Sequence, residues 1–459
     1  MDKNEILMQI RKQKEMMPNG PFKSVKERIR ALKLLKQNIK EMKDEIYDAL
    51  KKDLNKSEPE AYMTEVGLVL SELNYMIKHC KRFAKPKRVL MPAAQFPSKG
   101  FKVPCAYGSV LIISPWNYPF MLSIEPMVDA IAAGNSVVIK PSATSANVQM
   151  VVEKLIKKTF RPEEVFVVVG NRSESDFLLD QDFDYIFFTG STRVGKTIMQ
   201  KAADKFIPVT LEMGGKSPCI VDETANIELS ARRIVFGKFL NCGQTCVAPD
   251  YVFCDNKIKA RLVEEIKKQI VVQYGVDALR NENYPKLINK KQFDWVKSLI
   301  TKENLLFGGK FNENTLKIEP TLVNSTFDDE SMQEEIFGPV LPIVGFDSLD
   351  EVVAKINSRH KPLAFYVFSS SKRNQEKLIS SCDFGGGCIN DCVIHLATPK
   401  LGFGGIKESG VGGAYHGKAG FDTFSHYKSI VDKKMWLDLP MRYQPIGRVK
   451  YYFIKKFLK

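Results

Sequence analysis

Ser109-Val110-Leu111-Ile112-Ile113, followed by Ser114-Pro115-Trp116-Asn117-Tyr118-Pro119, opens the region of the chain that decides the fold. The first five residues form an apolar run of strand length, and Phe120–Ala133 is predicted as a helix that leads to a second strand at Ser136–Ile139. The alternation continues with strands at 165–169, 185–188 and 209–212 and helices at 146–160 and 194–205. This pattern predicts a parallel sheet covered on both faces. Right-handed crossovers make it a doubly wound, Rossmann-like domain that binds a nucleotide.

A second alternating set begins at Ser217 and predicts a second α/β domain. Its expected elements are strands at 217–221, 251–254, 321–323 and 364–368 and helices at 227–240, 258–273, 349–358 and 372–381. Before the first set, Ser24 and Glu27 form a capping-box pattern. One long amphipathic helix is expected behind it, reaching Ile46, and a second helical stretch at about 60–83. The proline-containing segment Ala84–Pro104 is expected to be an extended arm between domains.

The 459 residues are enough for two or three domains, and the formal net charge of +15 lies mostly at the two ends. Residues 1–100 carry a net charge of +9 and residues 433–459 a net charge of +7, so the middle is close to neutral. No nucleic-acid-binding module is visible. The nine cysteines are scattered, and neither a signal-peptide core nor an apolar run of membrane-spanning length is present. We therefore expect a reducing, cytoplasmic setting with free thiols.

Three residues are candidates for chemistry. Cys246 follows a Gly-Gln-Thr turn at the end of an apolar helical run, and it is either a nucleophile or a small buried residue, as most free cysteines are. Asn117 is held between prolines and could donate a hydrogen bond to an oxyanion, although a turn asparagine is the simpler reading. Glu212 ends an apolar strand, where its side chain would point into the ligand crevice. It is either a general base there or an acid that caps a helix or turn. The spacing of Cys242 and Cys246, with no histidine nearby, predicts no metal site.

Two further stretches could hold a cofactor. The turn Phe188–Lys196 closes a strand and opens a helix, so its glycines would let the backbone approach a phosphate. Its spacing is neither the usual dinucleotide fingerprint nor a P-loop, and an ordinary helix-start turn is as consistent with it. Glu335 is suited to ribose hydroxyls and Phe337 to a flat ring, but a charged loop beside a core phenylalanine fits equally well.

The order of the motifs is more specific than any one of them. They are Pro115–Pro119, Val137–Ser142, Phe188–Gly195, Leu211–Lys216, Gly243–Cys246, Glu335–Val340 and Phe403–Gly410. Together they resemble the aldehyde dehydrogenase superfamily from about residue 20 to residue 440. The runs 241–251, 414–417 and 436–443 resemble the class 3-type branch, which includes medium-chain, fatty and aromatic aldehyde dehydrogenases.

The resemblance implies the organisation of the chain. It implies an NAD(P)-binding domain at 1–83 and 103–212, a catalytic domain at 213–394 and a bridging arm at 84–102 and 395–459 that makes a homodimer. It also implies roles for single residues: Cys246 as nucleophile, Asn117 and the Cys246 N–H as oxyanion donors, Glu212 as the base for water, and Trp116, Lys140, Gly190, Ser191, Gly195, Glu335 and Phe337 as cofactor contacts.

The implied reaction is oxidation of an aldehyde to the acid with NAD or NADP, through a thiohemiacetal, hydride transfer and thioester hydrolysis. Many NAD-preferring relatives carry Glu three residues after the lysine that matches Lys140; here Ala143 stands there, so we expect NADP to be accepted as well. The alternatives are a coenzyme A-acylating enzyme, a non-catalytic protein with the same fold and a cysteine hydrolase. The basic, amphipathic tail 448–459 predicts either peripheral contact with a membrane or docking on the dimer surface.

Overall fold

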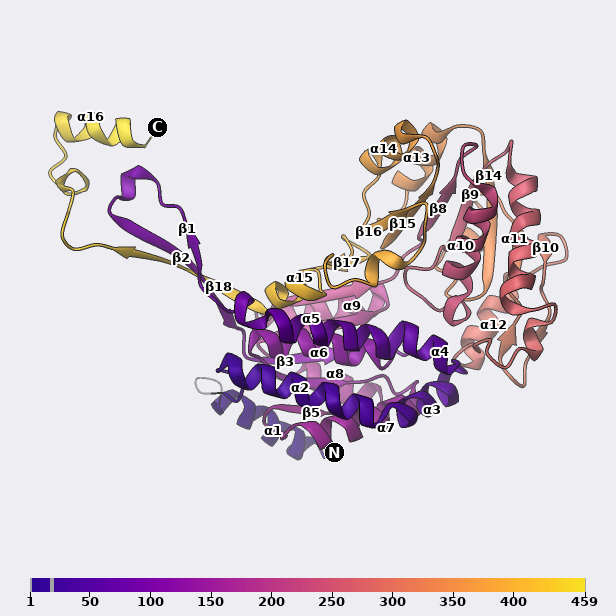
Figure 1. Cartoon of the computed structure of the whole chain (residues 1–459), viewed down its shortest axis with the longest axis horizontal. Helices are drawn as coiled ribbons and strands as arrows, with labels where there is room; N and C mark the ends of the chain where they lie inside the picture. The colour runs from indigo at the N-terminus through magenta and orange to yellow at the C-terminus, as the bar shows by residue number, and fades with distance from the viewer. Residues whose placement is uncertain (1, 17–19, 459) are drawn as a thin grey trace.

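The computed structural model describes residues 2–16 and 20–458 and shows two α/β bodies with a long β arm projecting from the first (Figure 1). The first body is built on a six-stranded sheet with the order β17-β7-β6-β3-β4-β5. Its strands are β3 (Ser109–Ile113), β4 (Ser136–Lys140), β5 (Val165–Val167), β6 (Tyr185–Gly190), β7 (Val209–Met213) and β17 (Gly410–Val411). All neighbours are parallel except β17, which runs antiparallel to β7. This confirms the predicted doubly wound α/β architecture.

Both faces of this sheet are buried, which explains why its strands read as continuous apolar runs. Successive residues of β3 enter opposite cores: Val110 and Ile112 pack into one and Leu111 into the other. The first core is covered by α2 (Val25–Glu41), α3 (Lys43–Leu54), α5 (Gly67–Phe83), α6 (Met121–Ala133) and α7 (Ala146–Thr159). The second is covered by α1 (Lys3–Met16), α8 (Arg172–Leu179) and α9 (Thr192–Ala203).

The second body contains a seven-stranded sheet with the order β10-β13-β14-β9-β8-β15-β16. Its strands are β8 (Pro218–Val221), β9 (Tyr251–Asp255), β10 (Leu305–Phe307), β13 (Thr321–Asn324), β14 (Val340–Phe346), β15 (Ala364–Phe368) and β16 (Gly386–Ile389). Its helices are α10 (Ile227–Phe239), α11 (Lys259–Tyr274), α12 (Lys290–Ser298), α13 (Leu349–Asn357) and α14 (Lys372–Ser381). A two-stranded ribbon, β11 (Phe311–Asn312) and β12 (Lys317–Ile318), lies beside it.

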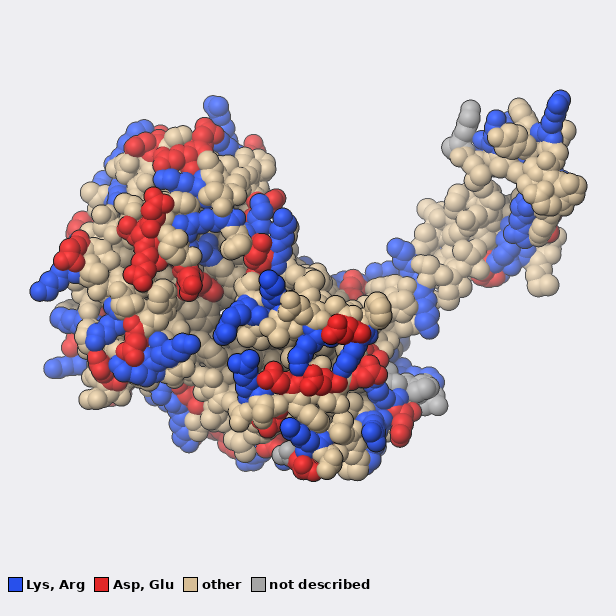
Figure 2. Space-filling model, turned by 180° about the vertical axis from the view of Figure 1, so that it is seen from behind, with Lys and Arg blue, Asp and Glu red and all other residues tan. Residues whose placement is uncertain are grey.

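The arm is a three-stranded antiparallel sheet with the order β1-β2-β18. β2 (Ser98–Ala106) and β18 (Ser425–Lys433) pair along nine residues each. β1 (Lys87–Val89) pairs with the other edge of β2. The helix α16 (Arg448–Phe457) lies at the tip of the arm (Figure 1). Figure 2 shows the same arm from behind and a body surface on which acidic and basic side chains are interspersed. Of the described helices, none is both long and apolar enough to cross a membrane.

Two details differ from the expected layout. β2 continues to Ala106, four residues past the expected end of the arm segment. Residues 410–423, expected in the arm, instead lie on the first body: β17 pairs with β7, and α15 (Gly417–Thr423) packs against α5 and α6. The Gly-rich composition of this stretch allows the close approach, because a Cβ at Gly420 would overlap Asp129 of α6.

The N-terminal helices also differ from the prediction of one long helix. The helix breaks at Met42, where α2 ends and α3 begins, and α3 ends at Asn55 in the left-handed region (φ 57°). The break cannot be recognised from the spacing of apolar residues, because Ile39, Met42 and Ile46 are all buried and keep the helical spacing across it. The second helical stretch is composed of α4 (Glu58–Ala61), a π-helical turn at Tyr62–Val66 and α5.

Candidate active site

Two cavities meet at Cys246, which lies between the two bodies. The first, of about 200 Å³, has mixed polar lining and contains eight of the ten residues predicted for the site. These are Trp116, Asn117, Gly190, Ser191, Glu212, Cys246, Glu335 and Phe337. The second, of about 170 Å³, is lined almost wholly by apolar side chains and shares Cys246, Leu122, Phe403 and Tyr415 with the first. The thiol is therefore a wall of both cavities.

The turn before Cys246 is set by three residues in the left-handed region. After α10 ends, Asn241, Cys242 and Gly243 have φ values of 51°, 55° and 74°. Only glycine fits at position 243, because a Cβ would come within 2.3 Å of the Gly338 carbonyl oxygen. This tight turn brings the thiol of Cys246 to the cavities. Burial, together with the carboxylates of Glu335 and Glu212, raises the pKa of the thiol to about 12.

Asn117 follows β3 and is 3% exposed, and its amide crosses to the cysteine loop. Its Nδ2 donates a hydrogen bond to the Gln244 carbonyl (3.0 Å), which uses one of the two amide hydrogens. The other hydrogen remains for a ligand in the polar cavity, which Asn117 lines. The backbone carbonyl of Asn117 accepts from Asn241 Nδ2 (2.8 Å). The two loops that carry Asn117 and Cys246 are thus joined directly.

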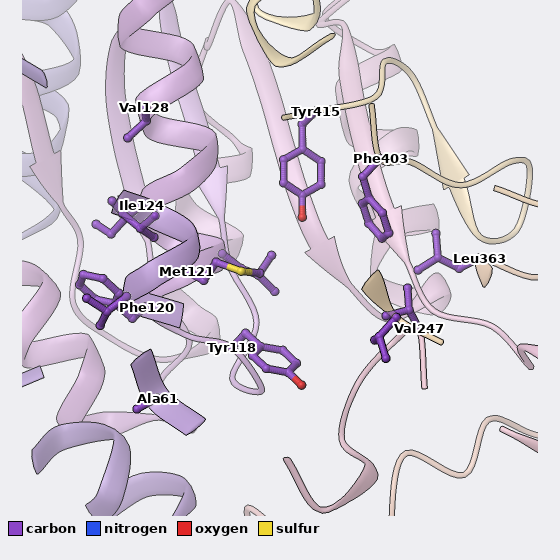
Figure 3. Close-up of a cluster of buried hydrophobic side chains, with 14 of the residues drawn as sticks. Ala61, Tyr118, Phe120, Met121, Ile124, Val128, Val247, Leu363, Phe403 and Tyr415 are labelled. Carbon is purple, nitrogen blue, oxygen red and sulfur yellow. The ribbon is translucent and has the colours of Figure 1, made fainter. Parts of the chain in front are cut away.

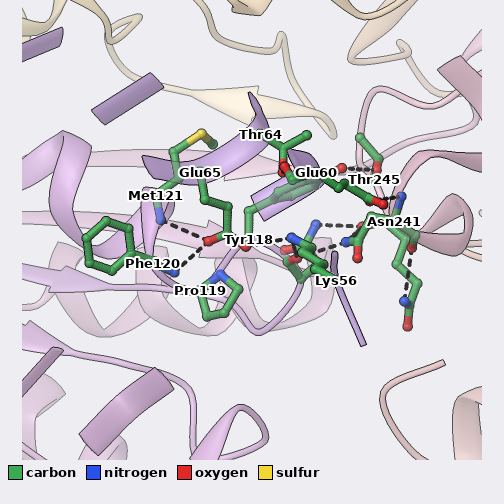
Figure 4. A network of polar contacts seen from close by, with 12 residues as sticks. Lys56, Glu60, Thr64, Glu65, Tyr118, Pro119, Phe120, Met121, Asn241 and Thr245 are labelled. Atoms are coloured by element: carbon green, nitrogen blue, oxygen red, sulfur yellow. Dashed lines mark hydrogen bonds and ion pairs between the residues drawn. The ribbon is translucent and has the colours of Figure 1, made fainter. Parts of the chain in front are cut away.

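A buried network supports this pair of loops (Figure 4). Lys56 Nζ donates to Asn117 O (3.0 Å) and to Glu65 Oε1 (2.5 Å), and both side chains are fully buried. Glu65 Oε2 accepts from the backbone N–H groups of Phe120 and Met121 at the start of α6. Lys56, which lies between α3 and α4 (Glu58–Ala61), and Glu65, in the π-helical turn, thus hold the 117–121 segment in place. No local sequence signal marks Lys56 or Glu65.

Glu212 lies at the carboxyl end of β7 and is 3% exposed. One oxygen accepts from the Gly405 N–H, and Oε2 has no hydrogen-bond partner among the described residues. Burial raises the pKa of this carboxyl well above its usual range. In its carboxylate form, a group with a raised pKa and a free oxygen in a cavity beside a thiol is suited to accept a proton from a bound molecule.

Glu335 and Phe337 lie in the loop before β14. A Cβ at Gly214 would meet Glu335 Oε2 at 2.2 Å, so the Gly214–Gly215 pair makes room for this carboxylate. Burial, followed by the charge of Asp250, raises the pKa of Glu335 to about 8. The Phe337 ring meets the Trp116 ring edge to face at 5.4 Å, and Phe337 itself is in the left-handed region (φ 50°). The two rings form one wall of the polar cavity.

Lys140 and Gly195 do not line the cavity. Lys140 Nζ donates to the carbonyls of Pro141 and Gly170, both at 2.8 Å, and burial lowers its pKa to about 8. Gly195 lies in α9, where a Cβ would overlap Met213 Sδ at 2.5 Å. Gly195 therefore lets α9 pack closely on β7, and this packing places Ser191 at the cavity.

The apolar cavity contains residues that the sequence did not single out. Tyr118 and Met121 line one side and Phe403 and Tyr415 the other (Figure 3). The rest come from the π-helical turn and α5, from the end of α10 and from the loop after β16: Met63, Thr64, Leu68, Phe236, Leu240, Val393, Ile394, Leu396 and Ala397. These residues are far apart in sequence and carry no shared pattern, so only the fold brings them together.

Cys242 and Cys246 have different surroundings. Cys242 is fully buried in an apolar cluster, and its thiol donates to Tyr284 Oη (3.4 Å). Burial raises its pKa to about 12. Neither cysteine is in a disulfide. Cys242 thus packs in the core below the turn, while Cys246 faces the cavities.

Comparison with known proteins agrees with this site. The family model described as "Aldehyde dehydrogenase family" matches residues 2–430. The chain belongs to the aldehyde dehydrogenase family. It is 45% identical to 4,4'-diaponeurosporen-aldehyde dehydrogenase of Staphylococcus aureus, with 95% of each chain covered. It is 42% identical to the dimeric NADP-preferring aldehyde dehydrogenase of Rattus norvegicus (93% and 94% covered) and 38% identical to aldehyde dehydrogenase family 3 member A2 of Pongo abelii (98% and 95% covered).

A solved structure described as the substrate-bound state of Staphylococcus aureus AldH superposes with a TM-score of 0.96 at 43% identity, covering 99% of both chains. The resemblance to the class 3-type branch is confirmed by these relatives. This aldehyde dehydrogenase oxidises an aldehyde to the acid with NAD(P).

The polar cavity fits such a cofactor. Thr189 Oγ1 and Glu212 Oε2 are buried polar atoms that have no partner among the described residues, and both residues line this cavity. Ser191, the N-cap of α9, makes no side-chain capping bond, so the first-turn N–H groups of this 12-residue helix have no acceptor from it. Such a helix start favours an anionic group.

Proposed function

We propose that this aldehyde dehydrogenase oxidises apolar aldehydes, medium- or long-chain aliphatic or aromatic, through a covalent intermediate on Cys246 that water hydrolyses. The observation that carries the proposal is the position of the thiol between a polar cavity and an apolar one. An apolar tail in the second cavity directs its carbonyl carbon to Cys246 Sγ. Burial of the tail drives binding by about 25 cal/mol per Å² of apolar surface removed from water.

In the first half of the reaction, the Cys246 thiol gives up its proton to water. The thiolate then forms a bond to the aldehyde carbon, and the carbonyl oxygen becomes an oxyanion. The second Nδ2 hydrogen of Asn117 and the Cys246 backbone N–H stabilise this oxyanion, and Lys56 and Asn241 fix the position of Asn117. NAD(P), when bound in the polar cavity, would supply the hydride acceptor, and loss of the hydride would leave a thioester on Cys246.

In the second half, Glu212 accepts a proton from water while the water oxygen attacks the thioester carbon. The C–S bond then breaks, and the acid leaves with Cys246 as thiolate. The free Oε2 of Glu212 supports this role, since it has no partner that would compete with water. Transfer of the thioester to coenzyme A, the alternative, needs no such base.

The remaining assignments belong to the same proposal. Gly190, Ser191 and Gly195 take the pyrophosphate region, Lys140 the adenosine ribose, Glu335 the nicotinamide ribose, and Trp116 and Phe337 the nicotinamide ring. Ala143 is exposed beside the Lys140 loop and carries no charge to repel a 2′-phosphate, so we propose that both NAD and NADP are accepted. The ratio of kcat/KM for the two cofactors tests this; a strict preference for NAD contradicts it.

We further propose the division into an NAD(P)-binding domain, a catalytic domain and an arm, with the arm forming a homodimer. The arm exposes apolar side chains, among them Ile430, Val431, Met435 and Trp436. Light scattering should give twice the 52.0 kDa of the chain. For α16, Ile454, Phe457 and Leu458 line a groove with the arm, while Val449 and Tyr452 face solvent. Flotation with anionic vesicles, with and without residues 446–459, distinguishes membrane contact from docking on the arm.

Replacing the nucleophile tests the reaction. Cys246→Ser should abolish aldehyde-dependent NAD(P)H formation while circular dichroism stays unchanged. Cys105→Ser, a free and half-buried cysteine in β2, is the matched control and should keep full activity. An active Cys246→Ser enzyme contradicts the proposal. Formation of an acyl-coenzyme A instead of the acid, when coenzyme A is present, favours the acylating alternative.

A further inference from the structure

Four polar side chains are buried together beside Tyr415, whose ring packs against His416. Glu72 lies on α5, Glu125 and Asp129 on α6, and His416 directly before α15. Their exposed fractions are 1%, 3%, 0% and 3%. The proposed reaction uses none of them.

The cluster is tight. His416 Nδ1 lies 3.4 Å from Glu125 Oε1, and one donor atom from each of Glu72, Glu125 and His416 lies within 4.8 Å of the others. Two backbone groups add to it: the Gly417 N–H donates to Glu72 Oε1 (2.8 Å) and the His416 N–H to Asp129 Oδ2 (3.3 Å). The Glu72 and Asp129 carboxyl groups face each other within hydrogen-bonding distance.

The groups are not satisfied by the protein alone. Glu125 Oε2, Asp129 Oδ1 and His416 Nε2 are buried atoms without a hydrogen-bond partner in the part of the chain that the structure describes. Within the same residues, no lysine or arginine forms an ion pair with any of the three carboxylates. The charges of several buried carboxylates that face one imidazole must be compensated by protons or by a bound cation, because unpaired buried charge costs several kcal/mol per ion.

We propose that Glu72, Glu125 and His416 bind a divalent metal ion of the manganese–zinc class, with Asp129 beside them. Carboxylate oxygens and an imidazole nitrogen are the donors that such ions take, and two positive charges neutralise two of the carboxylates. Two donors on opposite sides of one metal ion are about 4.2 Å apart, so shifts of the donor atoms by about half an ångström would close the site. The ion would join α5, α6 and the segment that leads into α15, next to Tyr415 in the wall of both cavities. Its role is structural.

Manganese is the better probe, because the nine cysteines compete for zinc. The tag-free full-length protein is purified without chelator, analysed for metal content and titrated with MnCl₂ while free Mn²⁺ is followed by electron paramagnetic resonance. We expect about one tightly bound ion per chain and a thermal midpoint that rises with Mn²⁺ and falls with EDTA. The tested variant is Glu125→Gln together with His416→Asn, which should lose the bound ion and the shift.

The chain offers a matched control. His360 Nδ1 and Glu408 Oε1 are also 3.4 Å apart, but this pair is exposed, so His360→Asn should leave manganese binding unchanged. Equal loss of binding in His360→Asn overturns the proposal. So does a wild-type protein that holds no metal and shows no thermal response to Mn²⁺, in which case protons compensate the carboxylates. If the double variant does not fold, metal content and the EDTA shift of the wild-type protein decide alone.

Discussion

Replacing Lys56 by methionine tests whether the buried Lys56–Glu65 pair holds the oxyanion donor in place. The substitution keeps the length of the side chain and removes its charge. Glu65 keeps its two backbone donors but loses its cation, and Asn117 O loses one of its two donors. Removing one partner of a fully buried pair costs about 3–5 kcal/mol of unfolding free energy.

The kinetic effect follows from the same contacts. A reacting group displaced by about 1 Å loses on the order of 100-fold in rate. Because Asn241 still holds the Asn117 carbonyl, we expect Lys56→Met to lower kcat by about 10- to 100-fold with a smaller change in KM for the aldehyde. Stopped-flow measurement of NAD(P)H formation gives the rate, and urea denaturation gives the stability.

Two comparisons make the test specific. Lys154→Met removes a lysine that pairs with Glu45 at 2.6 Å on the surface, and it should cost no more than about 1 kcal/mol and leave kcat unchanged. Lys56→Met combined with Glu65→Gln should regain part of the stability, since no uncompensated charge remains, but not the rate. A Lys56→Met enzyme with wild-type kcat, or with a stability loss equal to that of Lys154→Met, refutes the reasoning.

Three further results are expected. Glu212→Gln should give one burst of NAD(P)H per active site, because hydride transfer precedes the step that needs the base. The steady rate after the burst should be lower by about 10²–10⁴-fold. An unchanged steady rate in a stopped-flow trace would contradict this. Activity should rise from pH 6 to pH 9, because burial raises the pKa of both the Cys246 thiol and the Glu212 carboxyl and both groups act deprotonated. A pH profile that falls over this range would exclude them as the titrating groups. Leu68→Trp should fill part of the apolar cavity and lower kcat/KM for a long-chain aldehyde at least tenfold more than for a short one; equal losses in a substrate panel would place the tail elsewhere.

The sequence predicted the parts of the site that depend on local structure. Asn117, Glu212 and Gly190 all lie at or just after the carboxyl ends of parallel strands, and strand ends are recognisable from apolar runs. Cys246 required the order of the motifs in addition, because a free cysteine is usually a packing residue. The roles of these residues stay proposals.

Long-range features could not be read in this way. Lys56 and Glu65 are a lysine and a glutamate in helical stretches rich in both, and only the fold buries them against Asn117. The break at Met42 leaves the apolar spacing intact. The sequence also could not show that the Lys140 amine donates to the carbonyls of Pro141 and Gly170; its contact with the adenosine ribose stays a proposal.

The pairing of β17 with β7 has a consequence for the order of synthesis. Glu212 is made well before Gly404, Gly405 and Gly410, which complete its surroundings and the edge of its sheet. At about 5–20 residues per second, the ribosome needs roughly 10–40 s to cover this interval. A nascent chain therefore carries Cys246 and Glu212 for some time before the pocket around them is closed.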